Sequence, residues 1–473
     1  MPSFFMYSDT GDGAFVMRRL QKEGHRVKMY THDKTAKDVY RGLVPLSYSP
    51  SPAKGDVVLF DMVKHGAKAD AFRRSGFKVV GASKFADAIE INRPAGADVM
   101  RKIGIRVPET EVFKTLSAGQ KFLEKQEGTW YYKPSGNLHC ATTYNAEPKM
   151  LSRYLEWTKP HPPEQFELQK KMEGTEISLE GWFDGSRWVW PFNSTVEDKK
   201  LMAGDLGPRT GCMANIVWAY EDSRPTLALK TLTRLAPFLE AAGHVGPIDI
   251  NIMLDKEGTP YGLEWTPRFG YDALQALCLL LQGDLGYQLA RFASGQLEGF
   301  DVRTDAYALT INVSVPPYPN HEYAEREAKG LPVDPRLVTD AGVYPRDLMI
   351  QDGKPVVAGA DGSVATIGAV GPDAALLRSE VREKASKYAI PMAQYRIDPV
   401  SRFENVLTAL ESFSYDMPAV RTIDTPERPM PRYEEPRGNP ASRMVAGDND
   451  KPRASAVLPS SPPVMQDSPT ASI

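Results

Sequence analysis

Two strand–helix–strand patterns follow one another within about the first 95 residues, and they constrain the fold more than any other feature of the chain. In the first, apolar strands at residues 3–7 and 25–33 flank a segment of helical periodicity at 14–24, and residues 55–83 repeat the pattern. Strands joined through a helix pair in parallel, and a crevice forms at their carboxyl ends. We therefore predict a Rossmann-like α/β domain over residues 1–97.

Strand pairs dominate the next part of the chain. Residues 177–195 read as one hairpin, and residues 246–254 with 259–265 read as another. An amphipathic segment at 226–243 lies between them and has the pattern of a helix that ends at a glycine. This mixture predicts an α+β body over residues 98–304.

The pattern changes twice more towards the C-terminus. From about residue 305, a loop-rich sheet pattern leads to a final helix near residues 399–413, which predicts a C-terminal sheet domain over residues 305–415. The remaining residues are rich in Pro and Ser and include few large apolar side chains. Such a composition buries too little apolar surface to fold, so we expect a disordered tail over residues 416–473.

Two segments of the α+β body suit a nucleotide. Lys133 ends an apolar strand before a small polar loop, where an ammonium group and loop amides can meet phosphate oxygens. At residues 166–180, a strand edge can offer backbone groups to an adenine, and Glu176 just beyond it can accept ribose hydroxyls. A lysine in water and an ordinary charged turn are the alternative interpretations.

A glycine-rich loop and the second hairpin carry further candidate residues. The loop at 203–213 can expose amides to an anion and place Asp205 against an amine. In the hairpin, alternation puts Asp249 and Asn251 on a face that Glu264 of the return strand can share. Oxygen ligands that converge in this way suit Mg²⁺, which takes one or two carboxylates together with phosphate oxygens and water.

The end of this hairpin completes the candidate site. Thr266 follows Glu264 by two residues and therefore shares its face. Arg268 lies beyond the expected metal and faces whatever anion the metal delivers. A surface strand with ordinary charges is the alternative interpretation of this segment.

These segments, in this order and at these separations, resemble the ATP-grasp superfamily and, within it, the phosphoribosylamine–glycine ligase family. The resemblance covers about residues 1–410. Its motifs are GDGAFVMRRLQ, VVLFDM with VVGASKFADAIE, EGTEISLEGWFDG, GDLGPRTGCM, LEWTPRFG, YPNHEY and YRIDPVSR. It implies an ATP-grasp fold of α/β and α+β class, with a Rossmann-like N-terminal domain and a C-terminal sheet domain.

The resemblance also implies an ATP-dependent carboxylate–amine ligase that works through an acyl phosphate and releases ADP and phosphate. The implied cofactors are ATP and Mg²⁺, and the implied substrates are glycine or a similar carboxylate and phosphoribosylamine or a nucleotide-like amine. The implied nucleotide-binding residues are Lys133, Gln169, Lys170, Lys171, Met172 and Glu176. The implied metal ligands are Glu264, Asn251 and Thr266, and the implied catalytic residues are Arg268 and Asp205. The implied substrate-binding residues are Gly11, Gly13, Asp205, Arg209, Thr210, Gly211 and Arg268.

Several positions depart from the family pattern. The family has Asn where Thr266 and Arg209 stand and Lys near Ala97, and its Gly-rich loop is reduced here to PSGNLHCATT. After Gly270 the family has Asp-Pro-Glu, whereas this chain has Tyr-Asp-Ala at 271–273. These differences favour a specialised ligase that joins an amino acid to another amine in making a modified nucleotide. A catalytically inactive ATP-grasp binding protein is the other alternative.

A metal hydrolase is a weaker alternative. It would use His139, His161 and His244, but the histidines are scattered and none is paired at ligand spacing. Cys140 and Cys212 lie near the proposed loops, and we interpret them as small packing residues rather than nucleophiles.

Composition indicates the expected partners and compartment. A net charge of -3 argues against nucleic-acid or membrane binding. Three cysteines without CxxC spacing indicate neither a disulfide scaffold nor a zinc cluster. The start of the chain lacks the pattern of a signal peptide, and the longest apolar run is too short to cross a bilayer. We expect a cytoplasmic monomer or homodimer.

Overall fold

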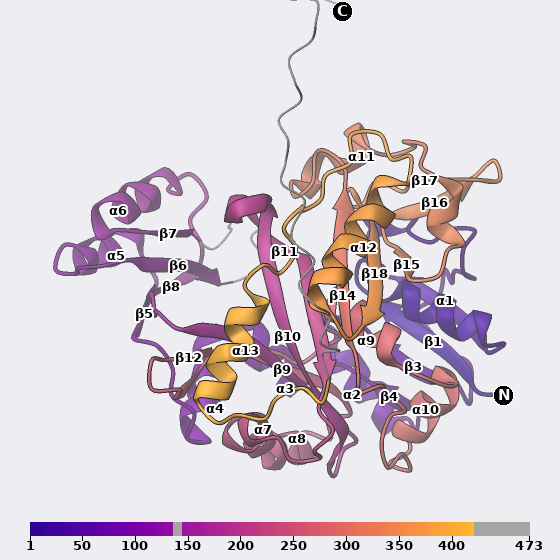
Figure 1. Cartoon of the computed structure of the whole chain (residues 1–473), viewed down its shortest axis with the longest axis horizontal. Coiled ribbons are helices and arrows are strands. Elements are labelled where there is room, and N and C mark those ends of the chain that lie inside the picture. Colours follow the sequence, from indigo (N-terminus) through magenta and orange to yellow (C-terminus); the bar gives the residue numbers. More distant parts are fainter. Residues whose placement is uncertain (136–143, 421–473) are drawn as a thin grey trace, which may run out of the picture. The chain divides into compact units, whose positions relative to one another are not determined.

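The computed structural model describes residues 1–135 and 144–420, which are drawn in colour in Figure 1. The loop with His139 and Cys140 and most of the expected tail lie outside the described residues. Among the residues described, no helix is both long enough and apolar enough to cross a membrane.

The N-terminal part contains a parallel four-stranded sheet with the order β2-β1-β3-β4. Its strands are β1 (Ser3–Ser8), β2 (Arg26–Thr31), β3 (Val57–Phe60) and β4 (Lys78–Val80), and its helices are α1 (Ala14–Lys22), α2 (Gly66–Arg74), α3 (Lys84–Ile91) and α4 (Arg93–Lys102). Every residue of β3 is buried, as expected of a parallel strand that is covered on both faces. The predicted Rossmann-like α/β layer is therefore confirmed.

A second sheet is antiparallel and has the order β5-β8-β6-β7. Its elements are β5 (Thr110–Phe113), α5 (Leu116–Leu123), β6 (Trp130–Ser135), β7 (Tyr144–Ala146), α6 (Pro148–Trp157) and β8 (Gln165–Lys170). One face packs Trp130 and Phe166 against Leu155 of α6. Because strand residues alternate between faces, Tyr131 and Lys133 point the other way.

The largest sheet has eight strands in the order β13-β12-β9-β10-β11-β14-β18-β15. Its strands are β9 (Thr175–Phe183), β10 (Trp188–Met202), β11 (Leu206–Ala219), β12 (Gly246–Leu254), β13 (Pro260–Thr266), β14 (Tyr307–Ser314), β15 (Val343–Pro345) and β18 (Ser363–Gly371). In Figure 1, β11, β14 and β18 lie side by side in the middle of the view. The sheet thus crosses the boundary expected at 304 and 305, and the four-part domain division remains a prediction.

Helices α9 (Ala273–Leu280) and α12 (Ala374–Ser386) pack on this sheet. The remaining helices and short 3-10 turns are η1 (Lys34–Ala36), η2 (Ala203–Asp205), α7 (Thr226–Lys230), η3 (Leu232–Leu235), α8 (Ala236–Ala241), α10 (Leu285–Phe292), η4 (His321–Tyr323), α11 (Ala324–Glu327), η5 (Pro335–Val338) and α13 (Phe403–Ser412). Strands β16 (Leu348–Gln351) and β17 (Lys354–Val357) form a separate antiparallel pair.

The β12–β13 hairpin fixes the register of the candidate metal ligands. Its turn is built by Asp255, whose carboxylate accepts hydrogen bonds from the amides of Glu257 (3.0 Å) and Thr259 (2.7 Å). The turn sets Ile252 opposite Gly262, and a register shift at Leu263 then brings Asn251 opposite Glu264 and Asp249 opposite Thr266. The shared face expected from alternation is therefore present.

Candidate active site

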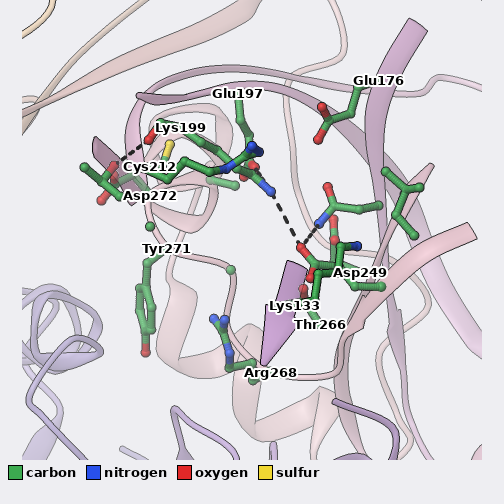
Figure 2. A pocket seen from close by; sticks show the side chains of 18 of the residues that line it. Lys133, Glu176, Glu197, Lys199, Cys212, Asp249, Thr266, Arg268, Tyr271 and Asp272 are labelled. Carbon is green, nitrogen blue, oxygen red and sulfur yellow. Dashed lines mark hydrogen bonds and ion pairs between the residues drawn. The ribbon is translucent and has the colours of Figure 1, made fainter. Parts of the chain in front are cut away.

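A cavity of about 640 Å³ lies where β6 and β8 of the antiparallel four-stranded sheet meet strands β9 to β13 of the large sheet. Figure 2 shows Lys199 and Glu197 across the cavity from Lys133 and Thr266, with Arg268 nearer Tyr271. The predicted site residues that line the cavity are Lys133, Gln169, Lys170, Met172, Glu176, Arg209, Thr210, Gly211, Asn251, Glu264, Thr266 and Arg268. Segments far apart in the sequence thus converge on one polar cavity.

Glu264 is held by cations on both carboxylate oxygens. Oε2 accepts a hydrogen bond from Arg93 at 3.0 Å, and Oε1 lies 3.7 Å from the ammonium group of Lys199. Oε1 also accepts a hydrogen bond from Nδ2 of Asn251 at 3.2 Å. Burial alone would raise the pKa of Glu264, but Lys199, Arg93 and Lys133 together lower it well below the ordinary range. This carboxylate is therefore ionised at neutral pH.

Lys133 contributes a partly buried ammonium group near the end of β6. Burial lowers the pKa of Lys133 to about 8, against the opposing effect of the carboxylate of Glu264. The nearby carboxyl of Glu167 is buried too, which raises its pKa. Lys133 thus carries its charge at neutral pH on the wall of the cavity, where a phosphate is an effective partner.

Lys199 links Glu264 to a second carboxylate. Its Nζ lies 3.4 Å from Oε2 of Glu197, and both residues project from β10 on the same face, two positions apart. Burial raises the pKa of Glu197, whereas the pKa of Lys199 is raised, despite burial, by the carboxylates of Glu197 and Glu264. Burial also raises the pKa of Asp249 well above its usual range. The cavity thus combines one strongly ionised carboxylate, that of Glu264, with other acids whose ionised form is disfavoured by burial.

These donors fit a divalent cation that arrives with phosphates. Glu264 offers one ionised carboxylate, and Asn251 and Thr266 offer neutral oxygens on the same face of the hairpin. Mg²⁺ typically uses one or two carboxylates and completes its shell with phosphate oxygens and water. A metal at Glu264 would compete with Arg93 and Lys199, and Oδ1 of Asn251 already accepts a hydrogen bond from Ser178.

The expected adenine-binding segment lies at the edge of the cavity. Gln169, Lys170 and Met172 line it, whereas Lys171 is ion-paired to Glu173 at 3.0 Å and does not belong to the lining. The amides of Lys170 and Lys171 both donate 2.9 Å hydrogen bonds within the protein, to carbonyls of residues 109 and 129. These two amides are therefore committed to the fold.

Arg268 lies on the cavity wall and is oriented by a partner from α3. Its Nε donates to Oε1 of Glu90 at 2.9 Å, and its Nη1 donates to the carbonyl of Phe269 at 3.0 Å. Burial raises the pKa of Glu90, although the nearby guanidinium opposes this. The position matches the expected one, and the predicted role towards an anionic substrate remains a prediction.

Asp205 lies outside the residues that line the cavity. Its carboxylate accepts a hydrogen bond from Nη1 of Arg396 at 2.8 Å, and Arg396 also pairs with Asp398 at 2.9 Å. The structure therefore gives Asp205 a partner within the protein, and its predicted catalytic role is without support from the cavity geometry.

The backbone amides of Gly11 and Gly13 donate hydrogen bonds within the protein instead of facing an open anion-binding loop. The amide of Gly11 donates to Oγ of Ser8 at 2.7 Å, and that of Gly13 donates to Oδ2 of Asp61 at 3.0 Å. Gly11 lines a second cavity, of about 720 Å³, which shares Asp12 with the lining of the first.

Several residues of the cavity wall were not among the predicted site residues. Arg93 stands one helical turn before Ala97, the position near which the family pattern has a lysine. Lys199 and Glu197 had a usable signal, since their spacing places both on one face of a strand. Arg346 and Asp272, which are hydrogen-bonded to each other, come from separate segments and had none.

The fold is that of the ATP-grasp enzymes. The structure matches the biotin carboxylase domain of a 2-oxoglutarate carboxylase from Hydrogenobacter thermophilus, solved with MgADP and bicarbonate, with a TM-score of 0.55 at 11% identity over 82% of this chain and 91% of that one. No protein-family model matches the chain.

Within this class, the chain is similar to phosphoribosylamine–glycine ligases. It is 27% identical to the enzyme of that name from Caldanaerobacter subterraneus, over 70% of this chain and 80% of the relative. The crystal structure of the Thermotoga maritima enzyme superposes with a TM-score of 0.65 at 19% identity, covering 84% of this chain and all of that one. The predicted resemblance is confirmed, and these relatives support an enzyme that forms a carbon–nitrogen bond.

Proposed function

We propose that this protein is an ATP-dependent carboxylate–amine ligase. The observation that carries the proposal is the convergence of Lys133, Glu264 and Arg268 on one cavity between two sheets of an ATP-grasp fold. In the proposed reaction, a carboxylate oxygen attacks the γ-phosphorus of ATP and ADP leaves. The amine then attacks the acyl carbon, the bond from that carbon to the phosphate oxygen breaks, and an amide and phosphate are released with the proton of the amine.

Positioning and charge neutralisation are the main tasks of the protein in such a reaction. Lys133 would contact phosphate oxygens, and Arg268, held by Glu90, would orient the anionic substrate or the acyl phosphate. Mg²⁺ would be held by Glu264 with Asn251 and Thr266 and would supply charge neutralisation at the phosphates. Glu176, at the start of β9 on the cavity wall, would accept the ribose hydroxyls.

The carboxylate substrate proposed is glycine or a similar amino acid, and the amine is phosphoribosylamine or a nucleotide-like amine. One observation favours the specialised ligase over the enzyme that uses phosphoribosylamine. A phosphorylated sugar requires free amides or cations, but the amides of Gly11 and Gly13 are used by Ser8 and Asp61. At the junction of the two cavities, Arg346 is neutralised by Asp12 and Asp272.

The test is phosphate release from MgATP by the purified protein. Glycine and phosphoribosylamine are supplied together, then separately, then replaced by a panel of amino acids and nucleotide-linked amines. Release that requires a carboxylate and an amine together supports a ligase, and the pair that works decides between the two substrate assignments. Absence of ATP binding and of phosphate release with every pair would overturn the proposal in favour of an inactive binding protein.

Cellular location and assembly also remain proposals. A cytoplasmic location and a monomer or homodimer agree with the ligase function, and light scattering of the purified protein would determine the oligomeric state.

A further inference from the structure

Glu180 lies on the wall of the candidate active site with one carboxylate oxygen unpaired. It projects from β9, lines the same cavity as Lys133 and Arg268, and is 3% exposed. Its Oε1 accepts a hydrogen bond from Nε1 of Trp182 at 3.1 Å, whereas no residue of the described ranges donates to Oε2. A carboxylate buried to this extent normally has partners on both oxygens, so the free Oε2 favours a ligand in the cavity.

Trp182 holds the carboxylate in place. Glu180 and Trp182 are two residues apart on β9 and therefore lie on the same face of the strand. The indole is stacked on the ring of Phe269, with 5.8 Å between the ring centroids, and it packs edge-on against Phe292 and Phe300. The indole N–H thus fixes Oε1, and Oε2 is the oxygen that can act on a substrate.

Oε2 is directed at the segment that carries Arg268. A methyl group added to Gly270 would lie 3.5 Å from Oε2, so this oxygen is a neighbour of the Gly270 backbone. Gly270 follows Arg268 by two residues, which is at most about 7 Å of extended chain. When Arg268 orients the acyl phosphate, as proposed above, an amine that attacks the acyl carbon therefore comes within reach of Glu180.

The neighbours of Glu180 do not include a cation that fixes its charge. Asp249 lies directly opposite on β12, and Asn193 lies opposite on β10. Cys278 of α9 is also close, since its pKa is raised mainly by burial and in smaller part by the carboxylate of Glu180. The guanidinium of Arg268 donates to a carboxylate of α3 instead, at 2.9 Å.

Burial therefore sets the protonation of this carboxyl group. It raises the pKa of Glu180 to about 7, although the hydrogen bond from Trp182 opposes this effect. A group whose pKa lies near the working pH can take up a proton and release it again, which is the property of an efficient general base.

We propose that Oε2 of Glu180 is the general base that accepts the proton of the attacking amine. This inference rests on the proposed ligase function. In this step, the lone pair of the amine nitrogen forms the bond to the acyl carbon, and an N–H proton moves to Oε2. The bond from that carbon to the phosphate oxygen breaks, and its electron pair leaves with the phosphate. Glu180 then releases the proton to water in the cavity.

The test separates formation of the acyl phosphate from attack by the amine. Hydroxylamine is a strong, uncharged nucleophile at neutral pH, so it traps an acyl phosphate as a hydroxamate without help from a base. With the carboxylate and amine that support phosphate release, we expect Glu180→Gln to lower kcat for the amide by about 100-fold or more at saturating MgATP. Hydroxamate formation, with hydroxylamine in place of the amine, should keep the wild-type rate. Glutamine preserves the size of the side chain and an oxygen that accepts from Trp182.

Two further variants and a pH profile complete the design. Glu240→Gln is the matched control and should change neither rate, because Glu240 is exposed on α8 and does not line the cavity. Glu180→Asp keeps the acid but withdraws it by one methylene group, so its amide rate should fall between those of the wild type and Glu180→Gln. The wild-type kcat for the amide should rise as the pH increases through about 7, where Glu180 loses its proton, and Glu180→Gln should lose this dependence.

Three results would overturn the inference and leave the ligase proposal standing. They are a wild-type kcat in Glu180→Gln, equal losses of amide and hydroxamate, and an effect confined to the KM for the amine. A wild-type protein that forms neither amide nor hydroxamate would instead overturn the ligase proposal itself.

Discussion

Replacing Lys133 by methionine is expected to strengthen the fold and weaken nucleotide binding. Burial lowers the pKa of Lys133 from the ordinary value of 10.5 to about 8, so the folded protein holds the charged form at a cost. At about 1.4 kcal/mol for each pKa unit, this cost is about 3 kcal/mol. Cavity water screens part of it, and we expect the free energy of unfolding to rise by about 1–3 kcal/mol.

The same substitution removes a charge-assisted hydrogen bond to phosphate, which predicts a loss of ATP affinity of about tenfold or more. Urea unfolding followed by tryptophan fluorescence measures the first effect, and calorimetric titration with MgATP measures the second. Lys121→Met is the matched control, because Lys121 is exposed on α5, which packs on the same sheet. It should change neither quantity. A lower free energy of unfolding in Lys133→Met would refute the burial argument, and unchanged ATP affinity would refute the phosphate contact.

The remaining predictions concern the metal ligand, the substrate, pH and the tail. Glu264→Gln should lower MgATP-dependent turnover by about 100-fold with the circular dichroism spectrum retained, since it removes the ionised ligand; full activity would exclude a metal role. Arg268→Ala should raise the KM for the carboxylate or the amine by about tenfold with ATP affinity within about twofold of wild type, and equal losses of both would count against a substrate contact. ATP affinity should fall as the pH rises through about 8, where Lys133 loses its proton. Over the same alkaline range, stability should gain from Lys133, because its folded pKa lies below the unfolded value and the unfolded chain binds more protons; a flat pH profile in both titrations would contradict this assignment. Truncation after Val420 should leave turnover unchanged, because the cavity is lined by residues of the described ranges that precede it, and a large loss would show that the tail takes part.

Local periodicity was sufficient to predict the elements and the faces of the candidate site. The pairing of Asn251 with Glu264 depends on a register shift at Leu263, which no sequence pattern indicated. The N-terminal strands and helices, by contrast, follow from apolar runs alternating with helical segments, and the turn at Asp255 follows from its own residues. Such features depend on residues that are close in sequence, so one sequence is enough to derive them.

Partners from distant segments could not be predicted in this way. The pairing of Arg93 with Glu264 joins α4 to β13, and that of Asp205 with Arg396 joins η2 to a loop close to the C-terminal helix. The pattern of either partner shows which face it occupies but contains no information about which residue lies opposite. The continuation of the large sheet from β11 to β14 is hidden for the same reason, because the two strands are separated by the whole β12–β13 hairpin.

The amides of Gly11 and Gly13 show a second limit on what can be predicted from the sequence. A glycine-rich loop before a helix has the pattern of an anion site, but the same amides satisfy side chains of the protein when a suitable acceptor lies nearby. Here Ser8 precedes the loop, and Asp61 follows the neighbouring parallel strand β3. Sequence spacing alone does not decide between these two uses.

The most direct test of the central claim follows an oxygen atom from the carboxylate substrate into phosphate. The carboxylate that supports turnover is labelled with oxygen-18 and incubated with the protein, MgATP and the amine, and the released phosphate is examined by mass spectrometry. We expect labelled phosphate together with ADP, because the carboxylate oxygen stays on phosphorus when the amine displaces the acyl group. Unlabelled phosphate, or AMP and pyrophosphate as products, would contradict it.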